Sequence, residues 1–191
     1  MNRISFAGAL AAVGLLTAMI GGVAGAQILG QPSQPVDNPL SVKVGMLFPT
    51  SGTDSHNGGT PQFSAGLDYA IAKTSAENPS LPSVYFDYAG GSKNGGHINT
   101  YGFGVAIRSY GNVPDAKTKS GSPYLGAGIG AYEESAKNGT SNSVSKLNIG
   151  GKVFAGDEFS GGFFVEANYQ ILSGIGGVTP SGFGVQVGMR F

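Results

Sequence analysis

Hydrophobic and polar residues alternate one for one along the last ten residues of the chain. The apolar positions of this segment are Phe183, Val185, Val187, Met189 and Phe191. The positions between them hold glycine, glutamine and arginine. Because successive side chains of a β-strand point to opposite faces, the segment predicts a strand with one apolar face and one face of polar residues and glycine.

Seven earlier segments show the same period of two, and each is bounded by turn-forming residues. With the C-terminal segment, the predicted strands are 42–48, 62–72, 83–89, 98–110, 123–132, 144–155, 161–172 and 182–191. No charged residue lies on the apolar face of any of these segments, and the strand charges all lie on the opposite face. Soluble sandwiches and membrane barrels both alternate in this way, so the alternation alone does not separate them.

Composition favours the membrane barrel. Only 12% of the 191 residues are charged and 34 are glycine, whereas a surface in contact with water normally carries far more lysine and glutamate. Strand lengths near ~9–11 residues suit a tilted crossing of a bilayer. Aromatic residues recur near strand ends, where an interfacial girdle would place them, at Tyr69, Tyr101, Tyr110, Tyr124, Tyr169 and Phe191. Since lipid offers backbone groups no partners, the sheet must close. The sequence therefore predicts an all-β fold, a closed antiparallel eight-stranded transmembrane β-barrel.

The N-terminal residues predict a secretory signal peptide. Arg3 supplies the positive charge, the stretch 4–23 is uncharged, and Ala24-Gly25-Ala26 is a small-residue cleavage site. A retained membrane helix is the alternative, because the apolar stretch is nearly long enough to span a bilayer. With cleavage, the expected organisation is a signal peptide over 1–26, a disordered periplasmic lead-in over 27–41 that is rich in proline, and the barrel over 42–191.

The strand pattern, the signal peptide, the run 161–169 (GGFFVEANY) and the terminal Phe191 together resemble bacterial outer-membrane β-barrels of the eight-stranded OmpA/OmpX type. The resemblance implies a barrel without a peptidoglycan-binding domain, with both termini in the periplasm. It also implies that Phe183, Val185, Val187, Met189 and Phe191 form the signal read by the barrel-assembly machinery. Expected partners are outer-membrane lipid, that machinery, periplasmic chaperones during biogenesis and a surface ligand of the outer loops. The outer loops would be 49–61, 90–97, 133–143 and 173–181, and the inner turns 73–82, 111–122 and 156–160.

An eight-stranded barrel is just wide enough for side chains to fill its interior. Buried charges persist only when they are paired and hydrogen-bonded, so we expect ion pairs in the lumen. If the two connections are symmetric, Lys43 lies opposite Asp68 and Lys152 lies opposite Glu166, with Arg190 near Glu166. The predicted lumen charges are Lys43, Asp68, Asp87, Arg108, Lys146, Lys152, Glu166 and Arg190. Rows of glycine would leave room for Phe154, Phe164 and Tyr132, which predicts a plugged lumen.

Other chemistry finds little support in the sequence. A net charge of zero argues against nucleic acid as a partner, and the lack of cysteine excludes thiolate metal sites. The segment Gly126–Ala131 matches a loose dinucleotide-binding pattern but lies within a predicted strand with no helix after it. The loop residues Asp54, Ser55 and His56, and the separate His97, form no recognisable catalytic or metal-binding set. We therefore expect no enzymatic activity, no catalytic residue, no cofactor and no metal.

The expected function is that of an outer-membrane barrel with a side-chain-filled lumen, acting in envelope integrity or in surface adhesion or recognition through its outer loops. Three alternatives remain open at this point. The barrel could be a narrow or gated pore for small solutes, a lipid-modifying outer-membrane enzyme, or a soluble periplasmic barrel that binds a small apolar ligand.

Overall fold

The computed structural model of the chain describes residues 38–75, 78–112, 121–137, 143–172 and 181–191, without the side chains of 52–54. The predicted signal peptide and most of the predicted lead-in lie outside these residues, as does most of the predicted outer loop 173–181. Within the described ranges, no helix is long and apolar enough to cross a bilayer.

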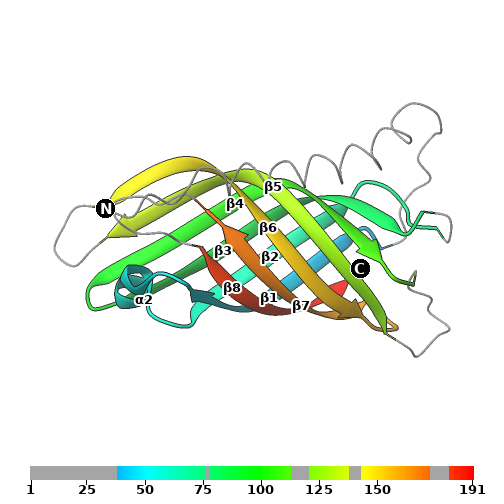
Figure 1. Cartoon of the computed structure of the whole chain (residues 1–191), viewed down its shortest axis with the longest axis horizontal. Coiled ribbons are helices and arrows are strands. Elements are labelled where there is room, and N and C mark those ends of the chain that lie inside the picture. The colour runs from blue at the N-terminus through cyan, green and yellow to red at the C-terminus, as the bar shows by residue number, and fades with distance from the viewer. Residues whose placement is uncertain (1–37, 76–77, 113–120, 138–142, 173–180) are drawn as a thin grey trace. The chain divides into compact units, whose positions relative to one another are not determined.

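Eight antiparallel strands form one closed barrel in which every strand pairs with its neighbours in the sequence (Figure 1). The strands are β1 (Leu40–Pro49), β2 (Gln62–Ala70), β3 (Ser80–Lys93), β4 (Gly96–Tyr110), β5 (Ser122–Lys137), β6 (Val144–Glu158), β7 (Phe163–Ile171) and β8 (Gly182–Arg190). This confirms the predicted fold class and strand number. One short helix, α2 (Gly52–Gly58), lies in the connection between β1 and β2.

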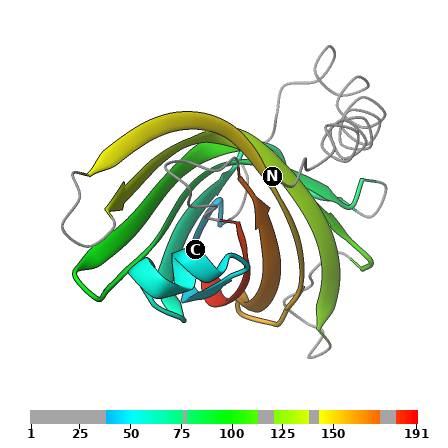
Figure 2. The same cartoon turned by 60° about the vertical axis from the view of Figure 1, so that its left-hand side comes forward.

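Pairing of β8 with β1 closes the sheet, as the view in Figure 2 makes visible. The pairing continues to the last residue, because the Phe191 N–H donates to the Leu40 carbonyl at 2.7 Å and the Leu40 N–H donates to the Phe191 carbonyl at 3.2 Å. We call the end of the barrel that holds Leu40 and Phe191 the terminus end. The opposite end, where α2 contacts β1, β3 and β4, is the loop end.

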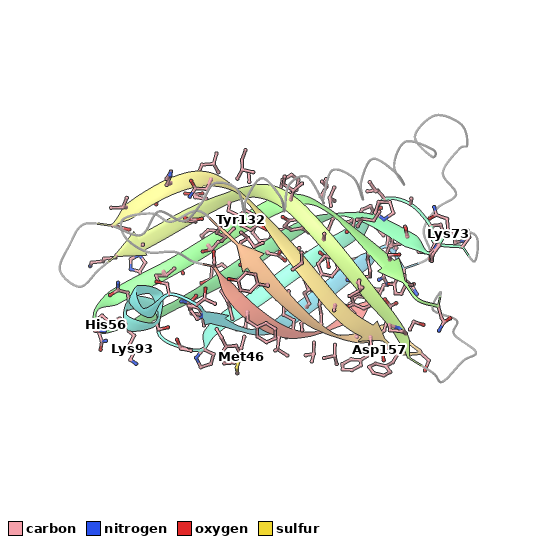
Figure 3. All side chains as sticks on the ribbon, viewed as in Figure 1. Met46, His56, Lys73, Lys93, Tyr132 and Asp157 are labelled. Atoms are coloured by element: carbon pink, nitrogen blue, oxygen red, sulfur yellow. The ribbon has the colours of Figure 1, made fainter. Side chains whose placement is uncertain are left out.

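The two faces of the strands are those that the alternation predicts. The apolar positions point outward and are exposed, as Met46 illustrates in Figure 3, whereas Leu47 beside it is buried in the lumen. Three aromatic residues on adjacent strands cluster on the outward face toward the loop end. The Tyr88 ring centroid lies 6.3 Å from that of Phe63 and 5.2 Å from that of Tyr101. Toward the terminus end, the outward rings of Phe159 and Phe163 stack at 6.0 Å. The barrel thus presents an apolar belt between two sets of aromatic rings.

Five strands, β1 and β3 to β6, are longer than the sequence pattern indicated. The predicted loop 90–97 is a two-residue turn at Asn94–Gly95, where both residues have positive φ (52° and 75°). An Asn-Gly pair with positive φ at both positions is the favoured tight connection of a hairpin, so β3 and β4 pair up to Lys93 and Gly96. Likewise β5 continues to Lys137, so residues 133–137 of the predicted loop 133–143 are strand.

These extensions correct one expectation about charge. Beyond the predicted strand limits, β5 and β6 place Glu133, Lys137 and Asp157 on the outward face. Each lies within five residues of the end of its strand as the structure bounds it, so the middle of the outward face remains free of charge. Glu134, which the pattern placed in a solvated loop, is buried inside the loop end of the barrel.

Candidate functional site

Ionisable side chains from seven of the eight strands meet inside the barrel. Four are cations and four are carboxylates. None of the eight side chains is more than 10% exposed. They are Lys43, Asp68, Asp87, Arg108, Lys152, Glu158, Glu166 and Arg190. Their formal charges cancel, which is the condition under which buried charges are tolerated. We call this set the charge network.

Glu166 on β7 accepts hydrogen bonds from side chains of three other strands. Its Oε1 accepts a hydrogen bond from Lys43 Nζ at 3.1 Å, and its Oε2 accepts from Arg108 Nη2 at 3.4 Å and from the Tyr124 hydroxyl at 3.1 Å. The donors come from β1, β4 and β5, so this one carboxylate joins strands across the lumen. Its side chain has no measurable exposure to solvent.

Lys43 and Asp68 are brought together as expected, but in a different register. Lys43 Nζ lies 3.1 Å from Asp68 Oδ2, although its cross-strand partner on β2 is Gly66. The connection between β1 and β2 is not symmetric, because α2 occupies part of it. The lysine side chain spans the two-residue offset, and Gly66 leaves the space for it: a Cβ there would lie 2.7 Å from Lys43 Cε.

Lys152 does not pair with Glu166, contrary to the expectation from a symmetric turn. The turn between β6 and β7 is centred on Gly161 and Gly162, both with positive φ, so Lys152 faces Gln170 across the strands. Its Nζ instead donates to Asp87 Oδ2 on β3 at 2.6 Å and lies 3.7 Å from the centroid of the Tyr85 ring. This cation is therefore held by a carboxylate and an aromatic face.

Arg190 likewise pairs with Glu158 and not with Glu166. Its Nε donates to Glu158 Oε1 at 3.0 Å and its Nη2 to Glu158 Oε2 at 2.9 Å, a bidentate arrangement. The Tyr110 hydroxyl donates to the same Oε2 at 2.5 Å. The longer β6 explains the change, because it carries Glu158 as the last strand residue on the lumen side at the terminus end.

Aromatic side chains fill the space around the charge network, and glycines make room for them. A Cβ at Gly102, Gly126 or Gly188 would collide with the rings of Tyr132, Phe154 and Phe164 respectively. All three rings are buried, as the sequence predicted, and Figure 3 places Tyr132 within the barrel. The hydroxyls of Tyr85 and Tyr132 lie 2.8 Å apart. Arg108 lies over the Tyr124 ring, with Cζ 4.3 Å from its centroid.

Toward the loop end, the lumen is filled by amides and hydroxyls. Gln186 links two of them, because its Nε2 donates to Ser64 Oγ at 3.2 Å and its Oε1 accepts from Asn168 Nδ2 at 3.1 Å. Nearer the loop end, Asn148 Nδ2 donates to Glu134 Oε2 at 3.0 Å. Lys146 lies on the same face of β6 but is exposed, so it takes no part in the charge network.

Little open space remains beside these side chains. A cavity of about 10 Å³ lies toward the terminus end, lined by residues that include Asp68, Arg108 and Arg190. Such a volume holds about one water molecule. Side chains of the described residues thus block the lumen.

The other candidate residues are not assembled into a site. His56 is exposed on α2, and the side chain of Asp54 lies outside the description. His97 lies on the outward face of β4, opposite Ser92 on β3 and Lys137 on β5, and no hydrogen bond joins its side chain to either. Gly126–Ala131 lies wholly inside β5, which excludes the strand–turn–helix context of a dinucleotide site.

Sequence reasoning missed three members of the lumen site. Glu158 was assigned to a turn, and the hydroxyls of Tyr110 and Tyr124 were assigned to an interfacial girdle. Both tyrosines are buried and bond to carboxylates of the charge network. The alternation could have placed both tyrosines in the lumen. Tyr110 is two residues from lumen-facing Arg108 on β4, and Tyr124 is two residues from lumen-facing Gly126 on β5.

The residues expected to form the assembly signal lie together on the outside of the barrel. Phe183, Val185, Val187 and Met189 are on the outward face of β8, and Phe191 follows them at the terminus end. All five are exposed, so none is used to fill the lumen.

No protein-family model matches the sequence, and no curated protein is similar enough to count as a match. Solved structures are similar in fold. The N-terminal β-barrel domain of Pseudomonas aeruginosa OprF is 14% identical, with a TM-score of 0.51 over 82% of this chain and 100% of that chain. Neisserial surface protein A is 16% identical, with a TM-score of 0.52 over 80% of this chain and 94% of its own.

The outer-membrane enzyme PagL is 16% identical, with a TM-score of 0.50 over 79% of this chain and 99% of its own. An outer-membrane enzyme and a surface protein therefore share this architecture, and at these identities the likeness concerns the fold alone. Together with the closed sheet and the outward apolar belt, it identifies the chain as having the OmpA/OmpX-type fold, the eight-stranded β-barrel of the bacterial outer membrane.

Proposed function

We propose that the protein is a closed, loop-bearing cylinder of the bacterial outer membrane, and that it acts in envelope integrity or in surface adhesion or recognition through its outer loops. The observation that carries the proposal is the contrast between the two faces of one sheet. The outward face is apolar over the whole belt, and the lumen is filled by a neutral charge network and aromatic rings.

The apolar belt supports a membrane location. Soluble monomers rarely expose apolar patches larger than a few hundred Å², yet every strand here exposes large apolar side chains, up to 76% exposure at Ile149. In a bilayer, lipid covers this surface, and the closed sheet leaves no strand edge of the belt unpaired. Aromatic rings near both ends of the belt suit the two interfaces of a membrane. Outer-membrane lipid is therefore the first partner that we propose.

The orientation follows from biogenesis in outer-membrane barrels. We propose that the terminus end faces the periplasm and that α2 and the loop end face outward. The terminal strand with Phe191 would then be read by the barrel-assembly machinery, with periplasmic chaperones as earlier partners. Deletion of Phe191 is expected to reduce the amount of folded protein in the outer membrane, and unchanged insertion of that deletion would contradict this part of the proposal.

The filled lumen supports a barrel that is closed to ions and not a channel. An ion that entered from one end would have to displace ion pairs donated by several strands, such as those of Glu166, and breaking a buried pair costs about 3–5 kcal/mol. A role in envelope integrity or in surface adhesion or recognition, and not in transport, is accordingly what we propose. The loops that would carry it lie at the loop end.

Two measurements test the proposal. Outer-membrane fractionation followed by gel migration of heated and unheated samples tests the location and the closed barrel, because a folded barrel migrates differently from the unfolded chain. Planar-bilayer conductance tests the plug, and we expect no large, steady open state. A protein found in the soluble fraction without detergent would overturn the membrane location, and a stable open state would favour the gated pore.

A further inference from the structure

Charged and imidazole side chains are rare on the outward face of the barrel. Among the strand residues that the structure describes, only four lie there: His97, Glu133, Lys137 and Asp157. The first three are on the adjacent strands β4 and β5 at the loop end. The other strand charges lie on the lumen side, so this cluster is a departure from the rule that governs the rest of the barrel.

The cross-strand register defines how the cluster is arranged. His97 is the direct partner of Ser92 on β3 and of Lys137 on β5. The next outward position toward the belt pairs Asn99 with Ser135. Residues paired in this way have Cβ atoms about 4.5–5.5 Å apart, so a lysine, an imidazole, two hydroxyls and an amide form one continuous polar row. We call these five residues the outward polar row.

The outward polar row begins where the apolar belt ends. Immediately below it lie Tyr88 and Tyr101, and the Tyr88 hydroxyl donates to Asn99 Oδ1 at 3.0 Å. Below those rings, Phe103 and Val105 are exposed on the same face of β4. A tyrosine that points its ring toward the belt and its hydroxyl toward an amide marks the boundary between hydrocarbon and headgroups. The row is therefore at the height of the headgroups if the belt is in lipid.

The two basic side chains of the row have no acidic partner in the part of the chain that the structure describes. Neither His97 nor Lys137 forms an ion pair there. Glu133 lies four residues from Lys137 on the same face of β5, about 13 Å along the strand. Both basic side chains are half-buried against the sheet, so they are held near their backbone positions and can serve an anion that comes from outside the barrel.

We propose that the outward polar row binds the phosphate of a lipid headgroup in the surrounding leaflet. Lys137 and His97 would donate to the phosphate oxygens, and the hydroxyls of Ser92 and Ser135 would complete the contact. The acyl chains of that lipid would lie on the exposed apolar surface of β4 and β5 directly below. This inference rests on the proposed membrane location, because only there does an acyl chain have the belt beside it.

The test uses the full chain refolded in a detergent without phosphate, with its fold checked by heat-dependent gel migration. The probes are phosphatidic acid and the diacylglycerol with the same acyl chains, which lacks only the phosphate. Lipid retained on the protein is counted by native mass spectrometry. We expect phosphatidic acid to be retained in preference to diacylglycerol, and the double variant His97→Ala/Lys137→Ala to lower that preference about tenfold.

Lys146→Ala is the matched control, because Lys146 is an exposed lysine at the same end of the barrel on the lumen-side face of β6. It should leave the preference unchanged. Equal retention of the two lipids by the wild-type protein, or an undiminished preference in the double variant, would overturn the inference. Complete displacement by millimolar inorganic phosphate would assign the row to free phosphate and overturn the lipid as ligand. A wild-type chain that shows no folded band would instead count against the proposed function.

Discussion

The half of the lumen at the terminus end and the half at the loop end are enclosed by the same eight strands but are filled differently. The charge network occupies the first, and reaches the middle of the barrel through Asp87 and Lys152. Amides and hydroxyls, such as Gln186, Asn168 and Asn148, occupy the second. The outward faces of both halves carry exposed apolar side chains.

Both halves contain buried polar atoms without a hydrogen-bond partner within the described protein, but in the charge network these atoms, Asp87 Oδ1 and Arg108 Nε, belong to groups that form ion pairs through their other atoms. Glu166 has three donors on its two oxygens. In the loop half, buried amide atoms of Gln62, Asn168 and Gln170 have no hydrogen-bond partner within the described protein. A neutral amide that lacks one bond loses about 1–3 kcal/mol, whereas an uncompensated buried charge costs more. Apart from Glu134, the buried charges of the described strands therefore lie in the charge network, where several strands supply partners.

The largest effect should follow from removing the carboxylate at the centre of the charge network. Glu166→Gln keeps the shape of the side chain but leaves Lys43 and Arg108 short of one negative charge. We expect the free energy of unfolding to fall by about 3–5 kcal/mol, measured by urea titration of the protein folded in lipid vesicles.

The double variant Glu166→Gln/Lys43→Met is the control for this prediction. It removes one charge of each sign, so it should recover part of the loss. In a double-mutant cycle, the double variant should lose less free energy of unfolding than the two single variants added together. A loss below 1 kcal/mol in the single variant would mean that the charge network does not stabilise the terminus half.

The outer wall should respond next most strongly, and alike in both halves. Val105 is half-exposed near the middle of β4, so Val105→Arg should place a guanidinium in hydrocarbon and cost about 2–4 kcal/mol. Val187→Arg on β8 should behave similarly. Ser135→Arg on β5 should cost roughly 0–1 kcal/mol, because Ser135 pairs with Asn99, beyond the ring of Tyr101 on β4. Equal tolerance of the three arginines in vesicle unfolding would contradict a lipid-covered belt.

The sequence predicted which face of each strand points outward, because the period of two needs no knowledge of the partners. Val42, Val44, Met46 and Phe48 are outward, and Lys43 between them is in the lumen. It could not predict which residues pair across strands, since register depends on the connections. The helix α2 shifted the pairing of β1 with β2, and the Gly161–Gly162 turn shifted that of β6 with β7.

The ion pairs illustrate a second limit of the sequence. All five residues named as candidates, Lys43, Asp68, Lys152, Glu166 and Arg190, lie in ion pairs of the lumen, but only Lys43 and Asp68 have the partner expected. Assuming a symmetric connection predicts only partners on adjacent strands. Lys152 on β6 reaches Asp87 on β3, and Glu166 on β7 reaches Arg108 on β4, across the interior of the barrel. Contacts of that kind depend on the curvature of the closed sheet.

A packing change in the terminus half should have an intermediate effect. A Cβ at Gly126 would meet the Phe154 ring and the Ile107 carbonyl, so Gly126→Val overfills the lumen there. We expect a loss of about 1–3 kcal/mol on vesicle unfolding. Adding Phe154→Leu should return part of it by freeing space beside the new side chain. No gain from the second substitution would indicate that the backbone contact dominates the cost.

The smallest effect should come from the loop half. Asn168 gives one hydrogen bond, from Nδ2 to Gln186 Oε1, and its Oδ1 has no partner within the described protein. Asn168→Ala therefore removes one neutral bond and leaves the neutral Gln186 oxygen, which one water molecule can satisfy in the space vacated by the amide. We expect a loss of about 1 kcal/mol, and Asn168→Asp provides the counterpart, because it puts a charge beside the neutral Gln186 in place of an amide. The aspartate variant should lose more than the alanine variant. If the two variants were equally stable in vesicles at neutral pH, the loop half would accept charge as readily as the terminus half, and the difference in filling would have no energetic basis.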